Sequence, residues 1–213
     1  MPRTHFSGRT LARSQALQLL FQAEATHRLV SEVLEGDYAL DELLVDGYHK
    51  ELASRELEPQ ELDERLSDLK NYTRELALGT DEMVHELDAI IERASENWSV
   101  SRMPSVDRNL LRIALFEILC VDDVDTAVAI DECVELAKAY GTDDSWRFVN
   151  GILGKIVRRI NAGEDVLAQA IDELDAQKQE AEEPEEAAEA DTTDGAEVSG
   201  EDTEQELPDW AQE

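Results

Sequence analysis

The sequence is poor in cysteine, with two thiols in 213 residues. Cys120 and Cys133 do not form a closely spaced pair, so they match no zinc-binding spacing, and each lies in an apolar helical pattern. We therefore expect two buried, reduced thiols, as is usual in the reducing cytoplasm. We expect neither a metal site nor a cofactor.

The sequence also lacks a long hydrophobic run. No N-terminal segment is apolar enough for a signal peptide, and no stretch approaches the ~20 apolar residues of a membrane span. These absences predict a cytoplasmic protein without a membrane partner. Strand-like alternation and internal repeats are missing too, whereas helical periodicity recurs along the chain. The sequence therefore predicts an all-α fold.

Patterns typical of catalytic sites are absent as well. The four histidines are scattered, and His85 lacks the second histidine of a zinc-protease helix. The segment 151–156, GILGKI, is too short for a phosphate-binding loop, and no Ser or Thr follows its lysine. No Gly-x-Ser-x-Gly motif occurs. We therefore predict that the chain is not an enzyme.

Positive charge is scarce and unevenly placed. The formal net charge is −32, and residues 172–213 alone hold 18 acidic residues and one basic residue. Two windows, residues 1–23 and 145–163, contain no acidic residue. The cations in them are Arg3, Arg9, Arg13, Arg147, Lys155, Arg158 and Arg159. Local positive surfaces on an acidic protein suit a selective polyanion site, because the remaining surface repels non-specific nucleic acid.

Helical periodicity defines the expected elements. The segments with helical stripes are 9–34, 62–76, 83–98, 106–120, 127–140 and 148–160. We expect a bundle of about seven helices. The segment 106–120 is apolar on nearly every side and should form the buried centre.

Glycines punctuate this pattern. Gly79 and Gly141 are each expected to end a helix, Gly141 with a positive φ, and an oxygen-bearing residue just after each should cap the next helix. The candidate caps are Thr80, Asp81, Thr142 and Asp143. Gly151 and Gly154 lie inside the last helix, where each costs about 1 kcal/mol relative to alanine. We therefore expect another backbone or a ligand to approach closely there.

Composition divides the chain into four parts. We expect a flexible basic arm at residues 1–8, an all-helical domain at 9–162 and a helical extension at 163–179. Residues 180–213 should form a disordered acidic tail, because Glu, Ala, Thr and Gly dominate there and aromatic residues are nearly absent.

Three segments together resemble one family. Ser95–Leu119 (SENWSVSRMPSVDRNLLRIALFEIL) and Ala127–Ile156 (AVAIDECVELAKAYGTDDSWRFVNGILGKI) resemble the bacterial NusB transcription antitermination factors, and Arg9–Gln22 (RTLARSQALQLLFQ) is similar to the family's first helix. The resemblance implies two small packed helical subdomains. It also implies a non-enzymatic adaptor for the single-stranded boxA RNA of ribosomal-RNA leaders. The implied partners are NusE, a small-subunit ribosomal protein, and the RNA polymerase antitermination complex.

The resemblance and the acid-free windows together give a set of candidate contacts. The residues expected to bind RNA are Arg9, Arg13, Asp144, Arg147, Phe148, Asn150, Gly151 and Lys155. The residues implied to face the protein partner are Phe21 and Asp107. Many family members have a run of arginines where this chain has RTLAR at 9–13. Fewer bases should mean weaker RNA binding alone and a shallower salt dependence.

Several candidates have structural alternatives. Phe148 lies on an apolar stripe, so it either packs in the core or stacks on an unpaired base. Asn150 either meets a base edge or bridges helices, while Asp144 and Asp107 are also credible helix caps. Gly151 suits either an RNA backbone or a packed helix. A different class of function is also open: a homodimeric protein–protein module whose basic face packs between subunits.

Overall fold

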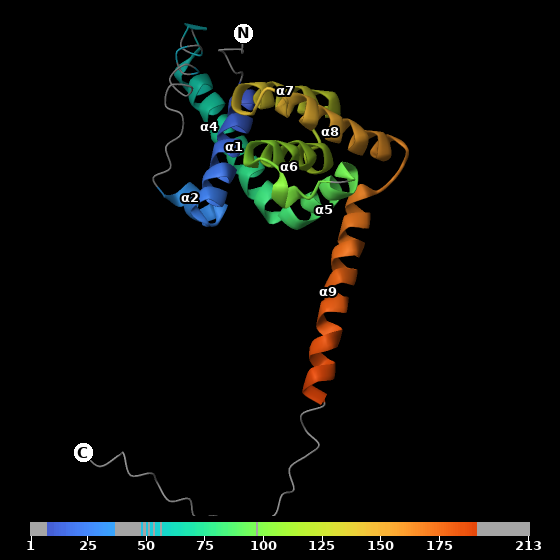
Figure 1. Ribbon diagram of the computed structural model, residues 1–213. Helices are drawn as coiled ribbons and strands as arrows, with labels where there is room; N and C mark the ends of the chain where they lie inside the picture. The colour runs from blue at the N-terminus through green and yellow to red at the C-terminus, as the bar shows by residue number, and fades with distance from the viewer. Residues whose placement is uncertain are drawn as a thin grey trace, which may run out of the picture. The chain divides into compact units, whose positions relative to one another are not determined.

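All described elements are helical. The computed structural model describes residues 8–36, 48, 50, 52, 54, 55, 57–96 and 98–190, with side chains as far as residue 180. Within these ranges there are eight α-helices, one short 3-10 helix and no strand, which confirms the predicted all-α class (Figure 1). None of these helices is long and apolar enough to cross a membrane.

Except between α2 and α4, where part of the chain is not described, short connections join consecutive helices. In chain order they are α1 (Gly8–Thr26), α2 (Val30–Glu35), α4 (Pro59–Glu82), α5 (Val84–Ser95), η1 (Val100–Arg102), α6 (Ser105–Cys120), α7 (Thr126–Tyr140), α8 (Ser145–Asn161) and α9 (Val166–Ala190).

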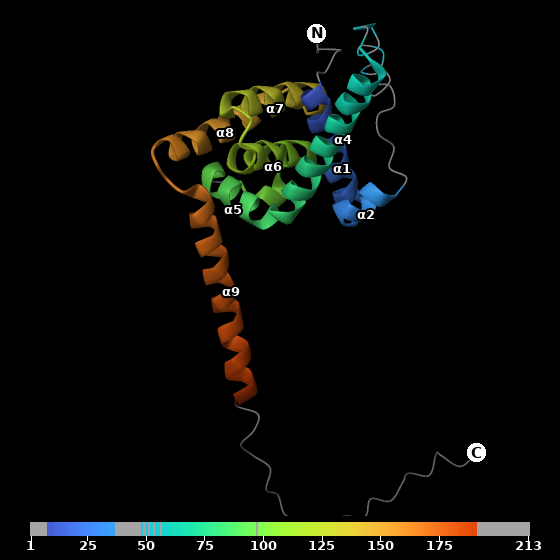
Figure 2. The same ribbon diagram turned by 180° about the vertical axis from the view of Figure 1, so that it is seen from behind.

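Helix α6 is the centre of the domain, as predicted. Leu110, Leu111, Ile113 and Leu115 are fully buried, and α6 packs against α1, α4, α5, α7 and α8. Both views show α6 between α7 and α5 (Figures 1 and 2). The buried residues form one continuous cluster, so the two expected subdomains share a single core.

The predicted first helix is divided in two. Instead of running from 9 to 34, α1 ends at Thr26 and α2 begins at Val30. His27 takes a positive φ of 54°, and the next amide, that of Arg28, donates back to the carbonyl of Ala23 at 3.1 Å. This backbone arrangement closes the end of α1 in the way that a glycine often does. The sequence has no glycine or proline there to signal the break.

Gly79 does not end a helix, which makes the predicted boundary wrong. Helix α4 continues through it to Glu82, and Thr80 lies fully buried inside the helix rather than capping the next one. The reason for a glycine is space. A Cβ at position 79 would lie 2.1 Å from Cζ of Phe116 on α6.

The joint between α7 and α8 also differs from the prediction. Gly141 has φ −92° and ψ −168°, which is extended rather than left-handed. Glycine is needed because a Cβ there would lie 2.5 Å from Cβ of Ser145. Neither Thr142 nor Asp143 caps α8. Instead the hydroxyl of Ser145 accepts from the backbone N–H of Thr142 at 2.8 Å, which holds the turn closed.

The expected helical extension is present and longer than predicted. Helix α9 continues past residue 179 to Ala190. The chain divides into two compact units at residue 174. Within the first unit, Val166 and Ala170 are buried, and Arg93 of α5 donates to Gln169 at 2.6 Å. Of the arm expected at residues 1–8, only Gly8 is described, and it begins α1. Of the disordered tail expected at 180–213, residues 180–190 are instead helical, and the rest lies outside the described residues.

Candidate nucleic-acid interface

Helix α8 separates apolar and polar residues cleanly. Its inward stripe is Val149, Ile152, Leu153 and Ile156. Its exposed side carries Arg147, Asn150, Gly151 and Arg158. A Cβ at Gly151 would meet nothing within 4 Å, so no helix of this domain packs there, and the expected close approach is not made by the described part of the chain. This exposed side is open to a ligand.

An aromatic pair borders the exposed side of α8. The ring of Phe148 is half-buried against the core, and its centroid lies 6.3 Å from that of Trp98 at an interplanar angle of 55°. Phe148 therefore combines its two alternatives, core packing and a place near the surface. Trp98 was expected on the inward stripe of a helix, but α5 ends at Ser95 and the indole is 50% exposed.

Arg147, next to Phe148 in the sequence, makes only weak interactions within the protein. Arg147 pairs with Asp144 at 2.9 Å, and both side chains are mostly exposed. The Arg147 guanidinium also lies 4.6 Å from the ring centroid of Trp146. Asp144 therefore orients Arg147, and its side chain makes no capping bond to α8. An exposed ion pair contributes about 0–1 kcal/mol, so a phosphate can replace the carboxylate at little cost.

Two further cations extend the same face of α8. Lys155 donates to the carbonyl of Ala94 at 3.2 Å and pairs with Glu96 at 3.0 Å. Arg158 is exposed and makes no ion pair with any residue that the structure describes. With Arg147, these residues place three cations along one helix. We call Trp98, Phe148, Arg147, Asn150 and Lys155 the α8 surface.

Arg13 does not lie on a surface, which contradicts its expected contact with RNA. Its side chain is 2% exposed, and its Nε donates to both carboxylate oxygens of Glu117 at 2.8 and 2.9 Å. The hydroxyl of Tyr72 donates to the same carboxylate, and Glu132 lies 3.7 Å away on the side of α7. Arg13 therefore neutralises a fully buried acid inside the core.

Arg9 is the exposed arginine of α1. It pairs with Asp123, and its guanidinium lies 4.8 Å from the ring centroid of Tyr72. These neighbours are not those of Arg147, which contacts Asp144 and Trp146. In the described part of the chain, Arg9 of the first acid-free window and Arg147 of the second therefore contact different residues.

The two residues expected to face a protein partner lie in different environments. Phe21 is 47% exposed and lines an open hollow of about 380 Å³ with Ser105 and Arg108. Asp107 is only 4% exposed. Its carboxylate lies near Ser145 at the start of α8, and its Oδ1 has no hydrogen-bond partner among the described residues. The structure contradicts a surface role for Asp107, because its side chain faces inward. Nor does it cap α6, whose N-cap is Pro104.

Burial gives Asp107 a distinctive pH dependence. Desolvation raises the pKa of Asp107 above its ordinary value of 3.8, although nearby Ser145 opposes that shift. A carboxyl group with a raised folded pKa stabilises the fold below its unfolded pKa, and this contribution is lost as pH rises through the folded value. We therefore expect Asp107→Asn to gain stability relative to the natural chain between about pH 4 and pH 7, measured by urea unfolding.

Asp123 is the matched control for that measurement. The hydrogen bond from Arg9 lowers the pKa of Asp123, so the stabilisation by Asp123 is complete above its unfolded pKa and is lost only as pH falls below about 4. Asp123→Asn should therefore show no trend in relative stability between about pH 4 and pH 7. If Asp123→Asn gained relative stability over that range as Asp107→Asn does, burial would not be what controls Asp107.

Sequence reasoning missed two features of this interface. It placed Trp98 inside a helix, and it gave no role to Trp146, whose ring lies beside both Arg147 and Lys138. The available signal was Pro104, which follows Trp98 closely and marks a helix boundary.

Comparison with known proteins gives consistent matches. The model of the NusB family matches residues 10–158. The transcription antitermination protein NusB of Desulforamulus reducens is 38% identical over 150 residues, which cover 70% of this chain and 90% of that protein. The protein of the same name from Salinispora arenicola is 42% identical over 148 residues, covering 70% and 93%.

Solved structures share the fold. NusB from Aquifex aeolicus matches with a TM-score of 0.52 and 22% identity, covering 75% of this chain and 95% of that one. A chain in a structure of antitermination factors NusB and NusE in complex with double-stranded RNA matches with a TM-score of 0.52 and 21% identity, covering 71% and 96%. At these identities the likeness shows the fold alone.

Proposed function

Because this chain belongs to the NusB family, we propose that it is a non-enzymatic, cytoplasmic adaptor in transcription antitermination. It binds single-stranded boxA-type RNA of ribosomal-RNA leader transcripts together with NusE and joins the RNA polymerase antitermination complex. The curated relatives are transcription antitermination proteins, which is the function that the resemblance in sequence implied.

The observation that carries the RNA proposal is the α8 surface. Single-stranded RNA readers stack unpaired bases on aromatic side chains and hold the backbone with cations. The α8 surface offers both, because Trp98 is 50% exposed beside Phe148 and three cations follow the same helix. These features lie on a protein with a net charge of −32, so the cationic face is a local exception that favours one docking site.

Each residue of the α8 surface has a distinct task. Trp98 and Phe148 stack on bases, and Asn150 offers a donor and an acceptor to a base edge. Arg147 and Lys155 exchange their exposed carboxylate partners for phosphates. Gly151 lets the RNA backbone approach closely, since no side chain of the described residues occupies the space above it. Arg9 adds a phosphate contact from α1.

NusE docks on another part of the domain. The half-exposed ring of Phe21 stands beside an open hollow of about 380 Å³, and such an aromatic anchor with a neighbouring pocket is typical of protein interfaces. Simultaneous contact with RNA and NusE then raises affinity by linking two weak interactions.

Stacking predicts a measurable loss of RNA affinity. We expect Trp98→Ala and Phe148→Ala each to weaken binding about 5- to 150-fold, because base stacking on an aromatic ring contributes about 1–3 kcal/mol. The measurement is fluorescence anisotropy of a labelled boxA-like RNA, with and without NusE. Trp98→Ala is the cleaner variant, since half of its ring is outside the core.

Arg74→Ala is the control for charge. Arg74 is an exposed arginine on α4, far from α8 in sequence, and its loss should leave the affinity unchanged. Equal effects of Arg74→Ala and Arg147→Ala would show that the interaction depends on general electrostatics alone. Indifference of the natural chain to both RNA sequence and NusE would refute the function itself. Light scattering on the same samples tests the alternative, a homodimer that hides Phe148.

A further inference from the structure

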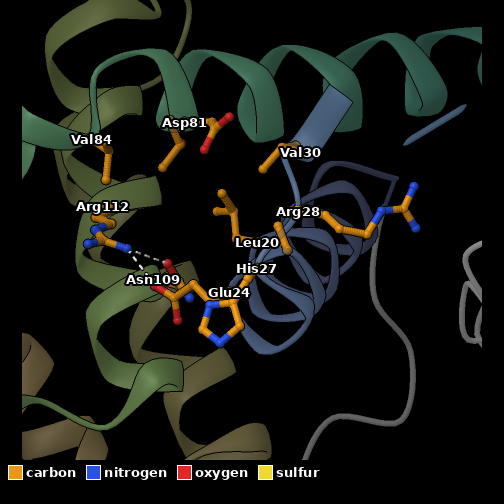
Figure 3. Close-up of a pocket in the computed structure, with 11 residues that line it drawn as sticks. Leu20, Glu24, His27, Arg28, Val30, Asp81, Val84, Asn109 and Arg112 are labelled. Carbon is orange, nitrogen blue, oxygen red and sulfur yellow. Dashed lines mark hydrogen bonds and ion pairs between the residues drawn. The ribbon is translucent and has the colours of Figure 1, made fainter. Parts of the chain in front are cut away.

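A second hollow, separate from the α8 surface, lies where α1, α2, α4, α5 and α6 meet (Figure 3). Its volume is about 290 Å³, near the lower end of small-molecule sites. Part of its wall consists of four apolar side chains and two buried polar ones. They are Leu20, Ala23, Val30, Val84, Thr80 and Asn109.

The side-chain amide of Asn109 has a hydrogen-bond partner for its oxygen but none for its nitrogen among the described residues. The side chain is fully buried, and its Oδ1 accepts from Nη1 of Arg112 at 3.0 Å. This bond fixes the orientation of the amide, because a flipped amide would turn N–H groups toward a guanidinium. The Nδ2 group has no hydrogen-bond partner among the described residues.

Arg112 holds that orientation firmly. It forms two bonds of 2.7 Å with Asp88 on α5 and one of 2.8 Å with Glu24 on α1. In the close-up, Arg112, Asn109 and Glu24 gather on one side of the hollow, joined by hydrogen bonds (Figure 3). The free Nδ2 donor is therefore preorganised and does not depend on a flexible side chain.

Thr80 supplies a second unpartnered group. Its side chain is fully buried, and its Oγ1 has no partner among the residues the structure describes. A hydroxyl can both donate and accept. Two unsatisfied buried polar groups lining one hollow are unusual, since each such group ordinarily finds a partner. A bound molecule that pairs with both would relieve both.

The charges around the hollow favour a neutral molecule. Arg112 is already compensated by Glu24 and Asp88. Burial raises the pKa of Asp81, which also lines the hollow, and the backbone N–H of Val30 opposes that rise. An added negative charge would face these carboxylates, and an added positive charge would face Arg112. A neutral polar group meets neither penalty.

We propose that this hollow binds a small neutral molecule that carries an amide or imide group on an apolar body. Its carbonyl oxygen accepts from Nδ2 of Asn109, and its N–H donates to Oγ1 of Thr80. Its apolar part packs against Leu20, Val30 and Val84. The site uses none of the residues of the α8 surface, so it stands or falls independently of RNA binding.

The test uses benzamide as the probe and the full chain as the receptor, followed by amide nitrogen–proton correlation spectra. We expect saturable shifts at the backbone amides of Thr80 and Asn109, with a midpoint on the order of 1 mM for so small a ligand. Toluene has the same apolar ring without the amide, and benzoate replaces the amide with a charge. Both should bind more weakly than benzamide.

Thr80→Val is the variant that keeps the shape of the wall and removes the hydroxyl. It should weaken benzamide about 3- to 10-fold, the effect of losing one hydrogen bond. The fold should persist, because valine leaves no buried group without a partner. Asn109→Leu removes the amide donor and should weaken benzamide binding more than Thr80→Val does. Shifts that toluene reproduces equally, or benzamide binding that is unchanged in Thr80→Val, would overturn the site and leave the hollow to water.

Discussion

Replacing Arg13 with alanine is expected to lower the free energy of unfolding by about 3–5 kcal/mol, because it leaves a buried carboxylate without its cation. Glu117 is fully buried, and Arg13 supplies its only cationic partner at hydrogen-bond distance among the described residues. Tyr72 still donates to it, but a neutral hydroxyl does not offset the desolvation of a charge. Urea unfolding at constant m-value measures the loss.

Two further variants identify the cause of that loss. Arg13→Met combined with Glu117→Gln removes both charges while retaining an acceptor for Tyr72, and it should recover most of the stability. Arg9→Ala breaks an exposed pair with Asp123 and should change stability by less than about 1 kcal/mol. If Arg13→Ala behaved like Arg9→Ala, the buried pair would contribute nothing. RNA binding by an Arg13 variant therefore needs its stability measured beside it.

Two glycines inside helices should respond oppositely to alanine. Gly79→Ala is expected to destabilise the domain by about 1–3 kcal/mol, since overpacking forces the surrounding side chains to move. The new Cβ would lie 2.1 Å from Cζ and 2.4 Å from Cε2 of Phe116, a ring that is 8% exposed. Gly151→Ala is expected to stabilise by about 0.5–1 kcal/mol, because it gains helix propensity in open space.

A second substitution separates crowding from other causes. Phe116→Leu shortens the side chain that meets position 79, so it should restore part of the stability lost in Gly79→Ala. Thermal unfolding of the single and double variants gives the coupling between the two sites. A Gly79→Ala protein more stable than the natural one would show that helix propensity outweighs the contact. Gly151→Ala has a further use, since it should weaken RNA binding while strengthening the fold.

Much of the fold was predictable because local patterns determine it. The apolar run at 106–120 requires a buried helix wherever the other helices lie, and the structure places it at the centre. The ends of the helices were harder to predict. The break at His27 depends on its backbone conformation and on the packing of α2, and no residue type marks it.

The candidate site was predictable only in part, because burial is a tertiary property. Arg13 and Arg9 are one helical turn apart, yet one lies inside and the other outside. The difference is Glu117, which is 104 residues away in the sequence and meets Arg13 only in the folded chain. Trp98 is the reverse case, a side chain expected inside that is exposed. The helical stripe continues in the sequence beyond Ser95, where α5 ends.

The connection between α4 and α5 has a consequence for the whole domain. A single residue, Met83, separates the end of α4 at Glu82 from the start of α5 at Val84, and the hydrophobic cluster is continuous across this point. The described chain therefore has no flexible tether between α4 and α5 that would let one of these helices melt while the other stays folded. The described helices of the first unit should lose their structure together, in one cooperative transition, and a rigid domain of this kind holds the RNA-facing and partner-facing regions at a constant separation.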